Sequence, residues 1–194
     1  MAAVRAGLDC IGENYVQEAL AKLPELRAEL ERYGAKTPRC RYIGQLQRNK
    51  DAAAVDHFDA IETLDRESLG NALERRAAAA GRPLDVMLQV DLSGEAGKGG
   101  CAPDALPALL AASQHWPHLR VTGLMAIPAP ADDPERLRPA FARLRELRDT
   151  LQSAAGGESL AELSMGMSAD FEIAIEEGAT SVRVGTALFG PRDT

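Results

Sequence analysis

The chain has 194 residues, 45% of them hydrophobic, and a formal net charge of −7 at pH 7. That length suits one domain with a substantial core, and the acidic balance disfavours non-specific nucleic-acid binding, which needs a basic face. No apolar run approaches the roughly 18 residues of a membrane span, and residues 1–7 lack the apolar core of a secretory signal. We therefore expect a cytoplasmic protein with no nucleic-acid or membrane partner.

Short strand patterns alternate with helical patterns along the whole chain. Strands are expected at residues 9–12, 41–44, 58–64, 84–92, 121–127, 160–164 and 181–184. Helices are expected at residues 16–33, 52–55, 66–80, 103–113, 134–151 and 168–177, and a last short turn begins at residue 187. Repeated strand–helix units imply parallel strands joined by right-handed crossovers.

The number of these units favours a barrel. A doubly wound open sheet is the alternative, but no Gly-x-Gly-x-x-Gly motif near the start supports its dinucleotide-binding version. A (β/α)8 TIM barrel fits the steady alternation better, although it needs one strand more than this sequence supplies. We expect a single α/β barrel domain over residues 1–194.

Cysteines and histidines are few and widely spaced, at Cys10, Cys40, Cys101, His57, His115 and His118. Their spacing matches neither a disulfide framework nor a zinc site. The residues expected just beyond the strand ends are mainly amides, hydroxyls and glycines. That set suits holding a ligand better than hydrolysing one, and we expect neither a metal nor a set of catalytic residues.

Two segments near the C-terminus have the pattern of an anion site. Residues 163–170 and 182–190 each run from a short apolar strand into a turn of small and hydroxyl residues that begins a helix. Backbone N–H groups at such a start are unpaired, and Gly or Ser lets a phosphate come close. In a barrel, a phosphate site typically follows the last two strands. The sequence therefore predicts a phosphorylated ligand here.

Two residues of these segments also have structural interpretations. Ser168 precedes Asp170 and Glu172, so it has the position of an ordinary helix cap followed by acidic residues. Arg183 lies between two valines of a strand expected to be buried on both faces, so its charge needs a partner. The structural alternative is an ion pair with Glu13 or Asp91.

Five segments in this order carry a family resemblance: residues 11–18, 42–50 and 123–128 and the two C-terminal segments. Together they resemble the YggS/PROSC family of pyridoxal 5′-phosphate (PLP) homeostasis proteins, over essentially the whole chain. The resemblance implies a barrel of the alanine racemase N-terminal type and a PLP carrier or buffer without established catalysis. It suggests PLP-dependent apoenzymes as partners and a monomer. The alternative is a PLP-dependent amino-acid racemase-like enzyme.

The resemblance also implies roles for particular residues. Ser168, Gly185 and Thr186 match the phosphate-binding residues, and Ser164 is a weaker candidate. Arg183 matches the residue that faces the pyridine nitrogen, where a permanent cation disfavours protonation of the ring and makes it a poorer electron sink. Asn14 matches part of the ring pocket.

The chain departs from the family pattern at two places. In the family, PLP forms a Schiff base with a lysine on the first barrel strand, and residues 1–7 here match the end of the helix that follows that strand. We therefore expect an N-terminally truncated barrel with two open strand edges and no covalent anchor. Among Lys22, Lys36, Lys50 and Lys98, only Lys98 is a plausible substitute. The second departure is Cys40-Arg41, where the family usually has Trp-His.

Overall fold

The computed structural model describes residues 2–47, 50–93, 99–153 and 160–190. Seven strands form one sheet in the order β1 to β7, and all neighbouring pairs are parallel. The strands are β1 (Cys10–Glu13), β2 (Arg39–Tyr42), β3 (Ala60–Leu64), β4 (Leu84–Gln89), β5 (Leu119–Met125), β6 (Glu162–Met167) and β7 (Ser181–Arg183).

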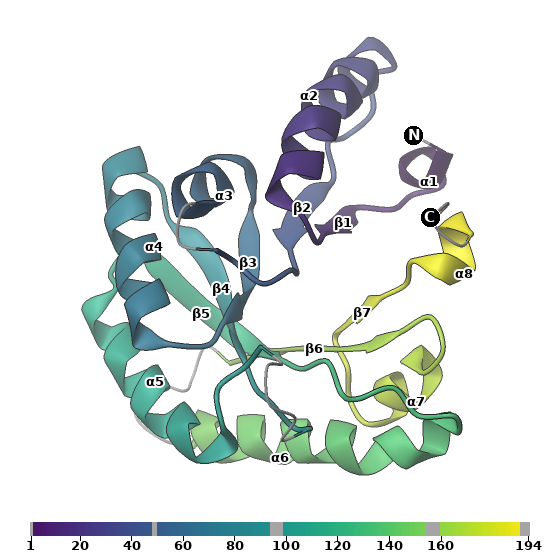
Figure 1. Cartoon of the computed structure of the whole chain (residues 1–194). Helices are drawn as coiled ribbons and strands as arrows, with labels where there is room; N and C mark the ends of the chain where they lie inside the picture. Colours follow the sequence, from purple (N-terminus) through teal and green to yellow (C-terminus); the bar gives the residue numbers. More distant parts are fainter. Residues whose placement is uncertain (1, 48–49, 94–98, 154–159, 191–194) are drawn as a thin grey trace.

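Most of the helices connect successive strands and pack on the outside of the sheet, whereas the first precedes β1 and the last follows β7 (Figure 1). They are α1 (Ala2–Arg5), α2 (Val16–Arg32), α3 (Asp51–His57), α4 (Glu67–Ala80), α5 (Leu106–Ala112), α6 (Arg138–Gln152), α7 (Phe171–Glu176) and α8 (Thr186–Phe189). Short 3-10 turns precede α5 and α6 and follow α5: η2 (Pro103–Ala105), η4 (Pro134–Leu137) and η3 (Ser113–His115). None of the helices in the described ranges is long and apolar enough to cross a membrane.

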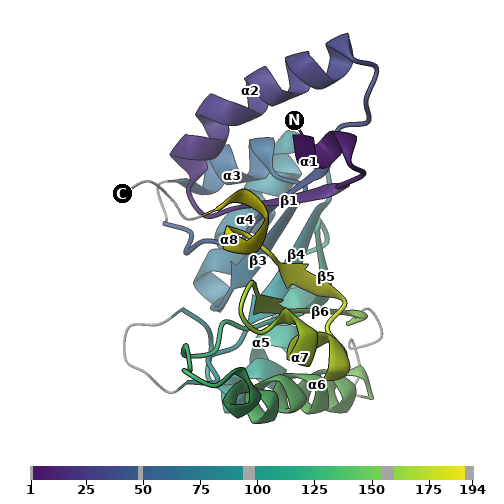
Figure 2. The same cartoon turned by 90° about the vertical axis from the view of Figure 1, so that its right-hand side faces the viewer.

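The strand order confirms the α/β barrel class. Every strand neighbours the next one in the chain, as in a TIM barrel, so each connection is a single crossover between parallel neighbours. Within the described residues no pairing joins β1 to β7, so the barrel is nearly but not fully closed. Figure 2 shows these two edge strands on the side that faces the viewer.

Several predicted boundaries shift by a few residues. β2 begins at residue 39 rather than 41, because the Arg39 amide donates to the Asp9 carbonyl and Cys10 pairs with Arg39. β6 continues to residue 167 rather than 164. Gly166 permits this with a φ of +93°, and a Cβ there would lie 2.6 Å from that of Ala174. α7 begins at residue 171 rather than 168, so residues 168–170 form a turn.

The apolar core lies between the sheet and the outer helices. Phe58, Trp116 and Phe141 are its largest fully buried side chains, each no more than 2% exposed. The Trp116 ring packs against Gly70 of α4, and its Nε1 donates to Asn71 Oδ1 at 2.7 Å. Burial of the apolar core as a whole is the main stabilising contribution to the fold.

The inner face of the barrel carries charged side chains. Near the amino ends of the strands, Asp85 of β4 accepts from Arg39 of β2 and from Arg120 of β5, each at 2.7 Å. Further along, Arg41 of β2 donates to Glu62 of β3 at 3.0 Å and to Glu162 of β6 at 2.8 Å. Because β2 and β6 are not neighbours in the sheet, the second contact crosses the barrel interior.

Candidate ligand-binding site

Three of the residues predicted to hold phosphate meet at the carboxyl ends of β6 and β7. The Ser168 hydroxyl oxygen accepts from the backbone amides of Gly185 at 3.1 Å and Ala187 at 3.3 Å. Thr186 is the first residue of α8 and is exposed beside them. Ser168, Gly185 and Thr186 are therefore brought together, although 17 positions separate Ser168 from Gly185 in the chain.

The helix-cap interpretation of Ser168 is wrong. α7 begins three residues later, and the residue that precedes it is Asp170. The Asp170 carboxylate accepts from the Met167 amide at 2.6 Å, while the Asp170 amide donates to the Met167 carbonyl at 3.0 Å. These paired bonds close the turn that presents the Ser168 hydroxyl to the α8 segment.

The surroundings of Gly185 fit a phosphate group. A Cβ on Gly185 would meet no atom within 4 Å, so the backbone there borders open space. The Ser168 oxygen accepts from two amides, which leaves its own O–H proton free to donate to an anion. A phosphate oxygen beside Gly185 would find the hydroxyl groups of Ser168 and Thr186 as donors.

Arg183 is held by two neutral acceptors. Its Nη1 donates to Ser164 Oγ at 2.6 Å and its Nη2 donates to the Ala126 carbonyl at 2.9 Å. Among the described residues it forms no ion pair with Glu13, which pairs with Lys22, or with Asp91. The expected burial of β7 on both faces is also wrong, because its residues are half-buried.

The guanidinium of Arg183 is nevertheless poorly solvated. Desolvation lowers the pKa of Arg183 below its usual value, and the carboxylates of Glu62 and Asp170 raise it in part. An arginine remains charged under such conditions, so this cation depends on the acceptors around it.

Ser164 lies deeper than the Ser168 cluster. It is 0% exposed, and its hydroxyl donates to Glu62 Oε2 at 2.6 Å while its oxygen accepts from Arg183. Those bonds occupy the hydroxyl from two sides. A direct contact between Ser164 and a ligand phosphate stays a prediction, whereas the structure places this hydroxyl between Glu62 and Arg183.

Asn14 lies at the opposite edge of the sheet from Arg183. It follows β1, is exposed, and lines a cavity of about 680 Å³ together with Tyr42, Gly44 and Lys50. Gly44 is required there, because a Cβ would lie 2.0 Å from the Asn14 carbonyl oxygen. This close approach fixes the backbone of Asn14 against the β2 end.

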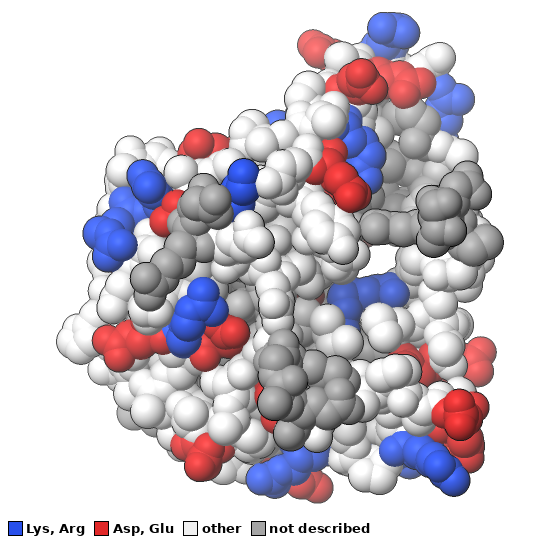
Figure 3. All heavy atoms as spheres, viewed as in Figure 1, with Lys and Arg blue, Asp and Glu red and all other residues white. Residues whose placement is uncertain are grey.

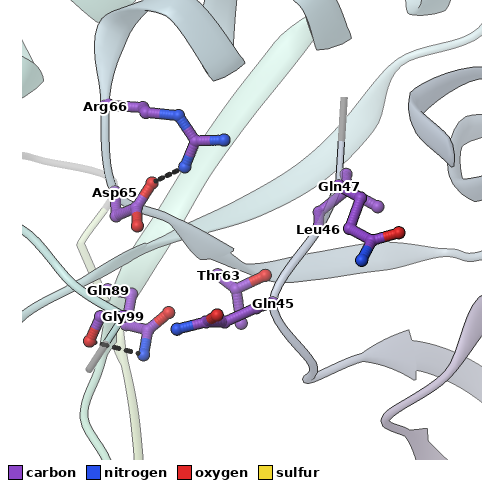
Figure 4. A pocket seen from close by; sticks show the side chains of 8 residues that line it. All are labelled: Gln45, Leu46, Gln47, Thr63, Asp65, Arg66, Gln89 and Gly99. Carbon is purple, nitrogen blue, oxygen red and sulfur yellow. Dashed lines mark hydrogen bonds and ion pairs between the residues drawn. The ribbon is translucent and has the colours of Figure 1, made fainter. Parts of the chain in front are cut away.

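A smaller pocket of about 210 Å³ adjoins this cavity and is rich in amides (Figure 4). The Gln89 Nε2 donates to the Gly99 carbonyl at 3.0 Å, whereas the buried Gln89 Oε1 has no partner among the described residues. Its lining residues are Gln45, Leu46, Gln47, Thr63, Asp65, Arg66, Gln89 and Gly99. The two cavities agree with the expected amide-rich strand ends.

The lysines are the candidate covalent attachment points for a ligand aldehyde. Lys22 reaches out to Glu13 with its side chain 57% exposed, and Lys50 lines the larger cavity. Lys98, the expected substitute, lies outside the described residues. In the described part of the chain, no three metal-ligating side chains gather, and the three cysteines are free.

The sequence prediction missed the buried carboxylate of Glu62, which is 1% exposed, and did not place Arg41 inside the barrel. A signal was present for Arg41, although not for Glu62. Arg39 and Arg41 alternate in one strand and Glu162 and Ser164 alternate in another, which places each pair on one face of the sheet. Figure 3 shows basic atoms inside the hollow on the right-hand side of the molecule.

Comparison with known proteins defines the family. The sequence model of the alanine racemase N-terminal domain matches residues 1–193. The pyridoxal phosphate homeostasis protein of Pseudomonas aeruginosa is 48% identical over 189 residues, which cover 97% of this chain and 76% of that protein. The chain belongs to the family of pyridoxal phosphate homeostasis proteins. The resemblance of its motifs to the YggS/PROSC family is thereby confirmed.

Solved structures of this family and of its fold agree with that assignment. PipY of Synechococcus elongatus with PLP bound is 39% identical, with a TM-score of 0.86 and coverage of 97% of this chain and 87% of PipY. An alanine racemase of Clostridium difficile in complex with cycloserine has a TM-score of 0.72 over 98% of this chain and 49% of the racemase. At 15% identity, the racemase shows only that the barrel fold is shared.

Proposed function

We propose that this chain binds PLP and serves in PLP homeostasis as a carrier or buffer. The observation that carries the proposal is the PLP-bound PipY structure, since PipY is 39% identical over nearly the whole chain. The names of the curated relatives point the same way. PLP itself would supply an aldehyde and a pyridine ring; the protein supplies the contacts that hold them.

The phosphate is assigned to Ser168, Gly185 and Thr186. Gly185 borders open space and lets an anion approach the backbone, while the two hydroxyl groups donate to it. The pyridine nitrogen is assigned to Arg183, and Asn14 to the other side of the ring pocket. Beside a guanidinium the ring nitrogen stays unprotonated, because a second positive charge there is unfavourable.

Binding is proposed to rest on these non-covalent contacts. Whether a lysine of this chain also forms a Schiff base with PLP is tested separately. Borohydride reduces such a bond to a stable pyridoxyl-lysine, which mass spectrometry detects. We expect no pyridoxyl group on Lys22, Lys36 or Lys50 after such treatment. PLP-dependent apoenzymes are the proposed recipients of the bound cofactor. The racemase alternative has no support beyond the shared fold, at 15% identity.

Equilibrium dialysis tests the proposed function. The chain is dialysed against PLP and, separately, against pyridoxal, which lacks the phosphate. We expect saturable binding of PLP at one site per chain and much weaker binding of pyridoxal. Equal binding of the two would contradict the phosphate assignment, and no saturable binding of PLP would overturn the proposal.

A further inference from the structure

A continuous set of buried and partly buried hydrogen bonds connects Arg183 to a carboxylate inside the barrel. Arg183 Nη1 donates to Ser164 Oγ, and the Ser164 hydroxyl donates to Glu62 Oε2, each at 2.6 Å. Glu62 Oε1 accepts from Arg41 Nη1 at 3.0 Å. The proposed function uses Arg183 but assigns no part to Glu62 or Arg41.

The direction of each bond in this set is fixed. A carboxylate only accepts, so the single hydroxyl proton of Ser164 is committed to Glu62. The lone pairs of the same oxygen are then available to Arg183, which only donates. Because Glu62 accepts the hydroxyl proton, the Ser164 lone pairs face the Arg183 guanidinium. A hydroxyl turned the other way would point its proton at the guanidinium.

The position of Glu62 is itself well determined. Its side chain is 1% exposed, and both of its oxygens have partners. Arg41 is held at its other end by Glu162 at 2.8 Å. Desolvation lowers the pKa of Arg41, but the bonds to Glu162 and Glu62 outweigh it and hold that pKa above its usual value. The carboxylate therefore has a permanent counter-ion that keeps it in place.

The hydrogen-bonded group around Glu62 is balanced in charge. Two cations, Arg41 and Arg183, face two anions, Glu62 and Glu162, and only Glu62 is linked to both cations. Among the described residues, Arg183 has only neutral direct acceptors, so Glu62 is the first negative charge along its hydrogen bonds. Removal of that charge would leave a poorly solvated guanidinium with the more weakly acting carboxylate of Asp170 as compensation.

We propose that Glu62, anchored by Arg41, is a positioning residue that acts through Ser164 to aim the Arg183 guanidinium at the pyridine nitrogen of a bound PLP-type ligand. The inference rests on the proposed function. Its consequence is that the protonation of the ligand's ring nitrogen is set by a carboxylate on β3, which does not touch the ligand. The unusual Arg41 of the Cys40-Arg41 pair is the counter-ion that makes a buried glutamate tolerable there.

The test uses pyridoxine 5′-phosphate, which has the phosphate and the pyridine nitrogen but no aldehyde, so no bond to a lysine enters the measurement. The absorption of the bound ligand is followed as a function of pH to obtain the pKa of its ring nitrogen. In the unchanged chain we expect that pKa to lie about one unit or more below its value in free ligand, because a cation faces the nitrogen.

Three variants separate positioning from a structural role. In Glu62→Gln and Ser164→Ala, we expect the pKa of the ligand's ring nitrogen to be lowered by no more than half as much as in the unchanged chain, and binding to be several-fold weaker. In Arg183→Gln, we expect that lowering of the pKa to be absent. Glu162→Gln is the matched control, because Glu162 also binds Arg41, whereas the Ser164 hydroxyl bonds to Glu62 and Arg183. The control is expected to keep the full shift. Far-ultraviolet circular dichroism and Trp116 fluorescence verify that each variant folds.

If Glu62→Gln fails to fold, the double variant Arg41→Gln/Glu62→Gln removes both charges together. Ser164→Ala still removes the hydroxyl that joins Glu62 to Arg183. If the pKa of the ring nitrogen is lowered as much in folded Ser164→Ala and in either Glu62 variant as in the unchanged chain, the positioning proposal is overturned. The proposed function would not be affected by that result. An equal loss of the shift in Glu162→Gln would also overturn it, because the effect would then follow Arg41 and not Ser164. No binding by the unchanged chain would overturn the proposed function as well.

Discussion

The hydroxyl oxygen of Ser168 accepts a hydrogen bond of 3.1 Å from the backbone amide of Gly185, and this bond ties the end of β6 to the segment that follows β7. The same oxygen accepts from the Ala187 amide at 3.3 Å. One side chain thus orders the backbone on which the proposed phosphate contacts depend, and it retains a proton to donate to the ligand.

Ser168→Ala is expected to weaken PLP binding roughly tenfold to a hundredfold, because a hydrogen bond to a charged group is lost and two amides lose their acceptor. Equilibrium dialysis measures the affinity. Ser113→Ala is the control, since the Ser113 hydroxyl donates to the Leu110 carbonyl at the end of α5 and has no part in the proposed phosphate site. Unchanged affinity in Ser168→Ala would remove Ser168 from the phosphate site.

Gly70→Ala is expected to destabilise the fold by about 1–3 kcal/mol through overpacking. The added Cβ would lie 2.3 Å from two ring carbons of Trp116, and the Trp116–Asn71 hydrogen bond opposes movement of that ring. This cost exceeds the gain of up to about 1 kcal/mol that alanine brings to a helix interior.

Urea unfolding followed by fluorescence measures this effect, because Trp116 is the only tryptophan of the chain. Ala79→Gly, at an exposed position of the same helix, reports the propensity term without a packing change. A Gly70→Ala variant more stable than the unchanged protein would show that the ring can move aside freely.

The buried thiols are expected to be unreactive in the folded protein. Burial raises the pKa of Cys40 to about 12 and that of Cys101 to about 11, and it also raises the pKa of the half-buried Cys10. At pH 8 the thiolate fraction of Cys40 is then about one in ten thousand. With Ellman's reagent, Cys10 should react first, and Cys40 and Cys101 only at the rate of unfolding.

The same shifts predict a loss of stability at high pH. A thiol whose pKa is raised in the folded state stabilises that state below its ordinary pKa, and the contribution falls as pH rises above that value. Urea midpoints measured between neutral and alkaline pH test this sign. Rapid modification of Cys40 in the folded protein would contradict the raised pKa of this thiol and both predictions that depend on it.

Glu177 is expected to make the fold sensitive to acid. Hydrogen bonds from Arg138 at 3.1 Å and Arg145 at 2.5 Å lower the pKa of its carboxyl. A lowered pKa stabilises the folded state above the ordinary glutamate value, and the contribution is lost as pH falls below it.

Glu177→Gln should therefore lower the unfolding midpoint at neutral pH and flatten its decline in acid. Glu146→Gln is the control. Glu146 pairs with Arg143 on the exposed face of α6, and both side chains are more than half exposed. Parallel acid profiles of the Glu177→Gln variant and the unchanged protein would contradict this prediction.

The arrangement of the fold could be predicted from the sequence because strand and helix periods differ. Seven strand positions were found, and the parallel order followed from the crossovers. The ends were less certain. The start of α7 depends on the Asp170 carboxylate that binds the Met167 amide, and that bond forms only once the turn has closed.

The candidate site could be predicted only in part. Ser168, Gly185 and Thr186 lie in turns whose small residues are visible in the sequence, and the structure brings them together. Glu62 could not be found in this way, since its role depends on partners 21 and 102 positions distant, Arg41 and Ser164. Burial of a charge becomes evident only when those partners are placed in three dimensions.

A crystal structure of this chain soaked with PLP tests the central claim most directly. The account predicts a phosphate within hydrogen-bond distance of Ser168, Gly185 and Thr186, and a pyridine nitrogen that faces the Arg183 guanidinium. PLP bound elsewhere, with this cluster unchanged and empty, would contradict it.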